Sequence, residues 1–102
     1  MAKSIIQTDK TCFICDTTTN LEKHHIFFGT ANRKISDKHG FTVWLCHDHH
    51  TGSNISAHRN REVDLALKRV CQTVYELDHS RDDFMKLIGR NYLEVEDEIH
   101  NG

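Results

Sequence analysis

The pattern of apolar and polar positions divides the chain into two parts. Between residues 12 and 58, short apolar stretches at 13–14, 26–28 and 41–45 alternate with glycine and polar residues, which is typical of short strands and loops. From residue 60 onward, apolar residues recur every three or four positions, as on one face of a helix. The residues of that face are Val63, Leu67, Val70, Val74 and Leu77.

A second, shorter helix is expected after Ser80. Its hydroxyl can accept a hydrogen bond from the backbone N–H of Asp83, and Gly89 favours a helix end. The apolar residues expected to pack it onto the first helix and close the core are Phe84, Leu87, Ile88, Tyr92 and Leu93. Residues 4–7 allow a short strand, whereas residues 94–102 are acidic, lack apolar periodicity and predict a loose tail.

Composition indicates that something other than apolar packing stabilises this domain. A chain of 102 residues with 37% hydrophobic residues forms one small domain with little core. Nine histidines and four cysteines favour metal as the additional constraint. We expect no export signal, hence a cytoplasmic protein with reduced cysteines, and no membrane association, because apolar runs are four residues or fewer.

Charge is distributed unevenly along the chain. Residues 1–61 carry eight Lys and Arg against five Asp and Glu, whereas residues 62–102 carry five against ten. The basic excess therefore lies in the part that holds most of the histidines. This split is compatible with a surface that faces phosphate, and equally with ordinary surface charge.

Two ligand pairs of equal spacing predict a zinc site. Cys12 and Cys15 are separated by two residues, as are Cys46 and His49, so each pair can bind one ion from a tight turn. The alternatives are packed free cysteines, a redox pair, or a zinc site in which His24 replaces Cys46. The fourth cysteine, Cys71, and Trp44 of the 41–45 stretch are expected to be core residues.

The adjacent histidines His24 and His25 form a second signal, together with His50 immediately after the zinc pair. At the end of a strand, successive side chains point to opposite sides, so the two neighbours are expected to have different roles. Phosphodiester hydrolysis with one metal ion needs a neutral imidazole as base and an ion that stabilises charge. Two adjacent histidines can supply a base and a ligand.

This order of residues resembles the HNH endonucleases of ββα-metal fold, most closely the small HNH proteins of bacteriophages and prophages. The resemblance covers residues 12–60 as the metal core, with helices over 60–93, within a single domain of residues 1–102. It implies a small α+β metal-stabilised domain, with a ββα-metal (HNH) core and a C-terminal helical hairpin. By the resemblance, His24 and His50 bind the catalytic ion and His25 is the general base.

The resemblance also implies a function and its partners. The expected activity is that of a DNA endonuclease or nickase, with a structural Zn²⁺ and a catalytic Mg²⁺, Mn²⁺, Ni²⁺ or Zn²⁺, in the cytoplasm of a bacterial host during phage DNA recombination or processing. A homodimer through the helix of residues 60–79, or a phage DNA-processing protein, is a further possible partner. A non-catalytic zinc module that binds nucleic acid or protein is the alternative.

The chain departs from the family at the middle letter of the motif, where Phe41 occupies the position of the usual asparagine. Either the backbone near Gly40, or the side chain of Asn32 or Asn54, replaces it, or the activity is weakened. Asn54 also occupies the usual place of a third metal ligand, but we favour His58 on chemical grounds. Contacts with phosphate are expected from basic residues near the histidines. These are Lys23, Arg33, Lys34, Lys38 and Arg59.

Overall fold

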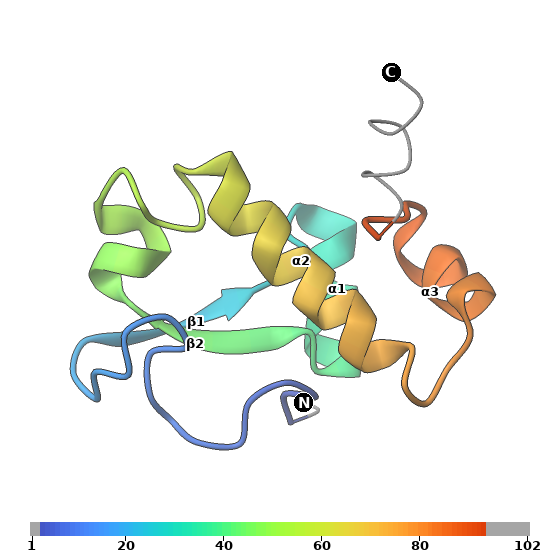
Figure 1. Cartoon of the computed structure of the whole chain (residues 1–102), viewed down its shortest axis with the longest axis horizontal. Helices are drawn as coiled ribbons and strands as arrows, with labels where there is room; N and C mark the ends of the chain where they lie inside the picture. Colours follow the sequence, from blue (N-terminus) through green and yellow to red (C-terminus); the bar gives the residue numbers. More distant parts are fainter. Residues whose placement is uncertain (1–2, 94–102) are drawn as a thin grey trace.

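A computed structural model of the chain describes residues 3–93, so the predicted acidic tail lies outside the described residues. The described part is a small α+β fold with one sheet of two strands (Figure 1). Its elements are β1 (Leu21–His25), α1 (Thr30–His39), β2 (Thr42–Cys46), the π-helical turn η1 (Asp48–Gly52), α2 (Arg61–Tyr75) and α3 (Arg81–Ile88). No helix of this part is both long and apolar enough to cross a membrane.

The antiparallel register of β1 and β2 decides which side chains share a face of the sheet. His24 lies opposite Val43, and both are buried on the face that α2 crosses (Figure 1). Lys23 lies opposite Trp44 on the other face. Trp44 is only half-buried there, so its prediction as a core residue was wrong.

Along the chain, the helix α1 follows β1 and precedes β2, in a segment for which the sequence predicted only strands and loops. Its single fully buried residue is Ser36, whose hydroxyl accepts a hydrogen bond from the N–H of Phe27 and donates one to the carbonyl of Phe27. A helix buried through a serine has no apolar periodicity to detect. Phe27, predicted to be in a strand, instead follows β1 and belongs to the core.

The two short N-terminal stretches also differ from expectation. Residues 13–14 form part of a turn. In place of a strand at residues 4–7, the Ser4 hydroxyl accepts hydrogen bonds from the N–H groups of Ile6 and Gln7 and so bends the chain.

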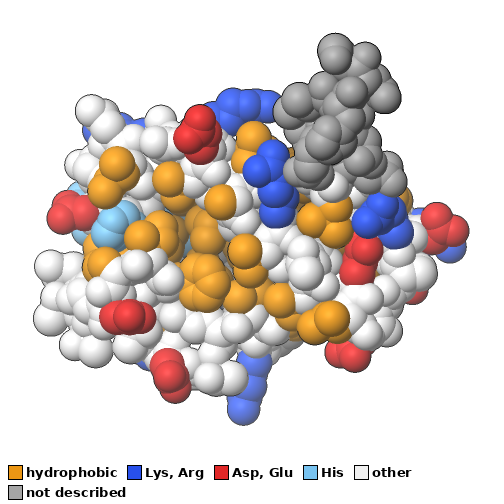
Figure 2. Space-filling model, in the orientation of Figure 1, with side chains coloured by type: hydrophobic (Ala, Val, Ile, Leu, Met, Phe, Trp, Pro, Cys, Tyr) orange, Lys and Arg blue, Asp and Glu red, His pale blue; other side chains and the backbone are white. Residues whose placement is uncertain are grey.

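The long helix α2 begins where the sequence indicated, because the side chain of Asn60 accepts hydrogen bonds from two free N–H groups of the first turn. The buried face is centred on Leu67, Cys71 and Tyr75. Val70, which the apolar pattern placed on that face, is 38% exposed. Figure 2 shows hydrophobic side chains across the middle of the molecular face on which α2 lies.

The short helix α3 completes the core from the side opposite the cysteines (Figure 1). It begins after Ser80, whose hydroxyl accepts a hydrogen bond of 3.0 Å from the N–H of Asp83. Phe84 is fully buried, and its ring contacts Tyr75 of α2 and Phe27. Tyr92 packs against Phe27 from the following segment, as predicted.

Candidate metal centres

Four predicted zinc ligands converge at one end of the molecule. The sulfur atoms of Cys15 and Cys46 are 3.8 Å apart, and Nδ1 of His49 lies 3.2 Å from the sulfur of Cys46 and 3.7 Å from that of Cys12. Ligands arranged tetrahedrally around zinc at about 2.3 Å are separated by about 3.5 to 3.8 Å. The cluster can therefore hold a metal ion such as zinc.

Backbone hydrogen bonds shape this cluster. The N–H of Asp16 donates to the carbonyl of Cys12, and Asp16 has a positive φ of 66°, which closes a tight turn around the first cysteine pair. The N–H of Phe13 donates to the carbonyl of Trp44, so the turn is attached to β2 two residues before Cys46. Although burial opposes its ionisation, backbone N–H groups, that of Cys46 first, lower the pKa of Cys12 to about 6.

The structure separates the alternatives for the cysteines. Cys46 joins the cluster and His24 does not, so the zinc site with His24 in place of Cys46 was a wrong alternative. Cys71 is fully buried in the core, as predicted, and burial raises the pKa of its thiol far above the usual range.

A second cluster consists of His24 from β1, His50 from η1 and His58 from the segment before α2. Their candidate ligand atoms all lie within 4.8 Å of one another. His24 is fully buried, and within the described part of the chain neither of its ring nitrogens has a hydrogen-bond partner. Burial, followed by the nearby imidazoles of His58 and His50, lowers the pKa of His24 to about 3. His24 is therefore a neutral imidazole at ordinary pH.

The unpartnered nitrogens of His24 fit a metal ligand better than a packed core residue. A buried polar atom without a partner costs roughly 1 to 3 kcal/mol. Coordination of an ion between His24, His50 and His58 would use one such nitrogen. The set of three imidazoles suits a transition metal such as zinc or nickel.

Glu22, which the sequence analysis did not single out, orients His50. Its Oε1 lies 2.7 Å from Nδ1 of His50, and its Oε2 lies 3.1 Å from Nδ1 of His47. These hydrogen bonds, that of His50 first, lower the pKa of Glu22. A carboxylate at Nδ1 fixes the ring with Nε2 available, an arrangement common behind metal-binding histidines.

Backbone hydrogen bonds hold His58 beside His50. The N–H of Ala57 donates to the carbonyl of His49 at 2.7 Å, and the N–H of His58 donates to the carbonyl of His50 at 3.2 Å. The structure thus brings His58 to the cluster, whereas Asn54 is exposed and outside it.

His25 points to the other face of β1, away from the imidazole of His24. Its Nε2 lies 2.8 Å from Oδ1 of Asp37 in α1. This hydrogen bond is the main cause that lowers the pKa of Asp37. A cavity of about 190 Å³ lies beside these residues, and it is lined by Lys23, His25, Phe28, Arg33, His50 and His58. The predicted base and two predicted ligands therefore share one cavity.

Backbone and hydroxyl groups support the segment after His25. The N–H of Ile26 donates to the carbonyl of Phe41 at 2.9 Å, while the Phe41 ring is fully buried in the core. Ser36 binds the backbone of the next residue, Phe27. Among the described residues that line the cavity there is no asparagine, so Asn32 and Asn54 do not line it.

The predicted phosphate contacts separate into two groups. Lys23 and Arg33 line the cavity that contains His25. Lys34, Lys38 and Arg59 are exposed and are not among the described residues that line it.

Sequence reasoning missed Glu22 and Asp37. Asp37 precedes Lys38 in a segment that was not expected to be helical, and Glu22 had no distinguishing neighbour. The only available signal was that each is a carboxylate in the histidine-containing half.

Comparison of the chain with protein-family models, curated proteins and solved structures gives no match. The functional interpretation therefore depends on the geometry of these residues and on the resemblance of their order to the HNH motif.

Proposed function

We propose that this protein is a metal-dependent nuclease of the HNH kind that hydrolyses phosphodiester bonds in DNA. The observation that carries the proposal is His24, a neutral, fully buried imidazole with no hydrogen-bond partner in the described chain, facing His50 and His58. The order of β1, β2 and a histidine-bearing helical turn supports a ββα-metal core, into which α1 is inserted between the strands.

In this proposal His24, His50 and His58 hold a divalent ion. When bound, the ion supplies positive charge that stabilises the phosphate and the leaving oxygen. Arg33 and Lys23 lie at the same cavity and neutralise phosphate charge.

His25 acts as the general base. Its Nε2–H group donates a hydrogen bond to Asp37, which leaves Nδ1 as the nitrogen that can accept a proton from water. Asp37 is a positioning residue, because it fixes the tautomer and orientation of the imidazole and balances its charge after protonation. The carbonyl of Phe41 and the hydroxyl of Ser36 support the chain beyond His25, which is the role of the missing asparagine in the family.

Plasmid nicking tests the proposal. Purified protein is incubated with supercoiled plasmid and Mg²⁺, Mn²⁺, Ni²⁺ or Zn²⁺. We expect nicking with at least one ion, and a loss of roughly 10²- to 10⁴-fold in His25→Ala, because general base catalysis contributes about that factor. His79→Ala is the matched control, because His79 stacks on Tyr75 at a distance from the cavity residues. Absence of nicking with every ion, or equal cutting by His25→Ala, would refute the nuclease proposal.

A non-catalytic zinc module is the second candidate, favoured by one observation: the cluster of Cys12, Cys15, Cys46 and His49 is complete without the histidine cluster. Metal analysis separates the candidates. A nuclease is expected to bind two ions per chain and to lose one in His24→Ala, whereas a zinc module binds one ion with or without this change.

A further inference from the structure

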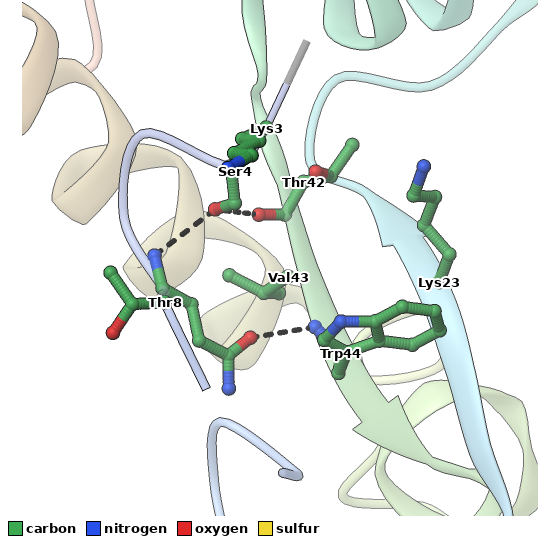
Figure 3. Close-up of a pocket in the computed structure, with 8 residues that line it drawn as sticks. Lys3, Ser4, Thr8, Lys23, Thr42, Val43 and Trp44 are labelled. Atoms are coloured by element: carbon green, nitrogen blue, oxygen red, sulfur yellow. Dashed lines mark hydrogen bonds between the residues drawn. The ribbon is translucent and has the colours of Figure 1, made fainter. Parts of the chain in front are cut away.

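A second cavity lies where the N-terminal segment meets the sheet. It has a volume of about 360 Å³ and is formed by the N-terminal segment and both strands (Figure 3). The residues that line it are Lys3, Ser4, Gln7, Thr8, Lys23, Thr42, Val43 and Trp44. Both charged residues in this set are lysines. The proposed nuclease reaction assigns no role to this cavity.

Hydrogen bonds hold the N-terminal wall of the cavity in place. The side-chain oxygen of Gln7 accepts from the N–H of Trp44 at 2.8 Å, and its nitrogen donates to the carbonyl of Thr11 at 2.6 Å. The hydroxyl of Ser4 donates to the carbonyl of Thr42. The cavity is therefore built by side chains that bind β2 directly.

Trp44 gives the cavity an aromatic surface. It is half-buried, and the ammonium group of the exposed Lys10 lies 4.5 Å from the centre of its ring. An aromatic ring with cationic groups around it is the combination that binds the bases and phosphates of single-stranded nucleic acid. A stacked base can displace the ammonium group of Lys10 from the ring of Trp44. The displaced ammonium group can then contact a phosphate of the same strand.

The cavity adjoins the proposed active site. Lys23 lines both cavities. In the sheet, Lys23 lies opposite Trp44. Two residues further along, on the same face, His25 lies opposite Thr42. Diagonal neighbours in such a sheet are about 7 to 8 Å apart, so one nucleotide can contact both His25 and Trp44.

We propose that this cavity binds an unpaired base of the DNA strand, stacked on Trp44, while Lys23 contacts the phosphate between this base and the bond to be cut. The inference rests on the proposed nuclease function and specifies its substrate class as DNA with an unpaired nucleotide beside the cleavage position. A base within a duplex enters the cavity only after unstacking and unpairing, which costs a few kcal/mol.

The fluorescence of Trp44 tests this directly, because it is the only tryptophan of the chain. The His25→Ala protein, loaded with zinc, is titrated with a single-stranded oligodeoxynucleotide of mixed sequence and with the corresponding duplex. We expect saturable quenching by the single strand, and at least tenfold weaker binding of the duplex. An unchanged emission during demonstrated binding, or equal affinity for both probes, overturns the proposal.

Variants separate stacking from general charge attraction. Trp44→Phe keeps an aromatic ring and is expected to bind single strands within a few-fold of the parent by fluorescence anisotropy of a labelled oligonucleotide. Trp44→Leu is expected to bind roughly 5- to 100-fold more weakly, since base stacking contributes about that factor. Lys86→Ala, in α3, is the control for loss of one positive charge. Equal binding by Trp44→Leu and Trp44→Phe, both retaining zinc, overturns the proposal.

The result is distinguishable from a failure of the nuclease proposal. Quenching and the difference between the Trp44 variants require no cleavage, so they can occur in a protein that proves to be non-catalytic. Conversely, the wild-type protein could nick plasmid while Trp44→Leu keeps the wild-type preference between gapped and duplex DNA. That result would support the nuclease proposal and contradict the proposal that the cavity binds a base.

Discussion

Two neighbouring histidines on β1 have opposite surroundings. His24 faces the interior and two other imidazoles, whereas His25 faces the cavity and a carboxylate. The alternation of side chains along a strand was enough to predict that the two histidines would have different surroundings. The spacing of the cysteines was enough to predict that the zinc ligands would converge. Glu22 and Asp37 were not predictable, because their partners lie 28 and 12 residues away and no local pattern marks a carboxylate that will receive a histidine N–H.

Glu22 is expected to control metal affinity at the histidine cluster. In Glu22→Gln, Nδ1 of His50 loses its carboxylate partner, and affinity at this cluster should fall roughly 10- to 100-fold. Calorimetric titration with Zn²⁺ or Ni²⁺ measures the change, with Glu62→Gln, at the exposed start of α2, as the matched control. Equal affinity of the two variants would remove Glu22 from the site.

Cys71 is expected to resist modification while the protein is folded. Its thiol is fully buried and its pKa is raised by that burial, so the reactive thiolate is scarce and inaccessible. In zinc-loaded protein, alkylation followed by mass spectrometry should leave Cys71 unmodified, and denaturation should expose it. Rapid labelling of Cys71 in zinc-loaded protein would show that the core opens locally.

At the scale of elements, the cap of α3 was predictable and burial through polar groups was not. Ser80 accepts the N–H of Asp83, as the sequence indicated, whereas the cap formed by Asn60 appears only in the structure. The helix α1 was not predicted because its buried contact is formed by Ser36. The buried face of α2 was predicted to include Val70, whereas the structure buries Cys71 and Tyr75. In α2, Gln72 is fully buried through hydrogen bonds to Glu76 and Asn91, which an apolar pattern does not register.

The junction between α1 and β2 depends on Gly40. This residue has a φ of 76°, and an added Cβ would clash with the carbonyl oxygen of Lys3. Gly40→Ala should destabilise the fold by about 2 kcal/mol or more, because conformational strain and a backbone clash combine.

Gly89→Ala is the matched control for Gly40→Ala. Gly89 ends α3 with a φ of 83° but has open space around the Cβ position, so its change should cost only about 1 kcal/mol. Urea unfolding of the zinc-loaded variants measures both values. Equal destabilisation would mean that the contact between Gly40 and the N-terminal segment contributes nothing.

The connection between α2 and α3 is expected to depend on pH through Glu76. Although burial opposes ionisation, hydrogen bonds from Gln72 and then Arg81 lower its pKa from 4.5. A lowered carboxylate pKa stabilises the fold above the unfolded pKa, and this contribution is lost as pH falls through the folded pKa. Glu76→Gln should therefore be less stable by about 1 kcal/mol at neutral pH, and this difference should shrink as the pH falls below 4.5.

Thermal unfolding of wild-type and Glu76→Gln protein across this pH range measures the difference. A constant difference at every pH would indicate that shape, and not ionisation, is responsible. The exposed Glu62→Gln variant serves again as a control for the loss of one carboxylate.

At the scale of the whole molecule, the strands β1 and β2 and the helix α3 lie towards opposite ends (Figure 1), and the residues of both candidate metal clusters come from β1, β2 and the segments next to them. The core around Phe27, Phe41 and Phe84 is small, so the cysteine cluster is expected to provide folding free energy. Cys46→Ser, or a strong chelator, should abolish cooperative unfolding and reduce far-UV circular dichroism. His24→Ala should retain both, since it affects only the second cluster.

The sequence predicted this division into a metal-containing half and a helical half because ligand spacing and helical periodicity are local properties. It could not predict the cavity at Trp44, which forms only when the N-terminal segment folds back onto β2 through Gln7. Contacts between residues 37 positions apart are set by the tertiary structure.

The last cysteine-cluster ligand, His49, is joined by a peptide bond to His50 of the second cluster. Without an ion at the cysteine cluster, we therefore expect η1 to lose its fixed position and the second cluster to lose His50. On the proposed function, the two ions would then bind in a fixed order, and newly synthesised protein would not cut DNA until zinc is supplied. A single residue inserted between these histidines would uncouple that order, so this position is where we expect evolution to tolerate length changes least.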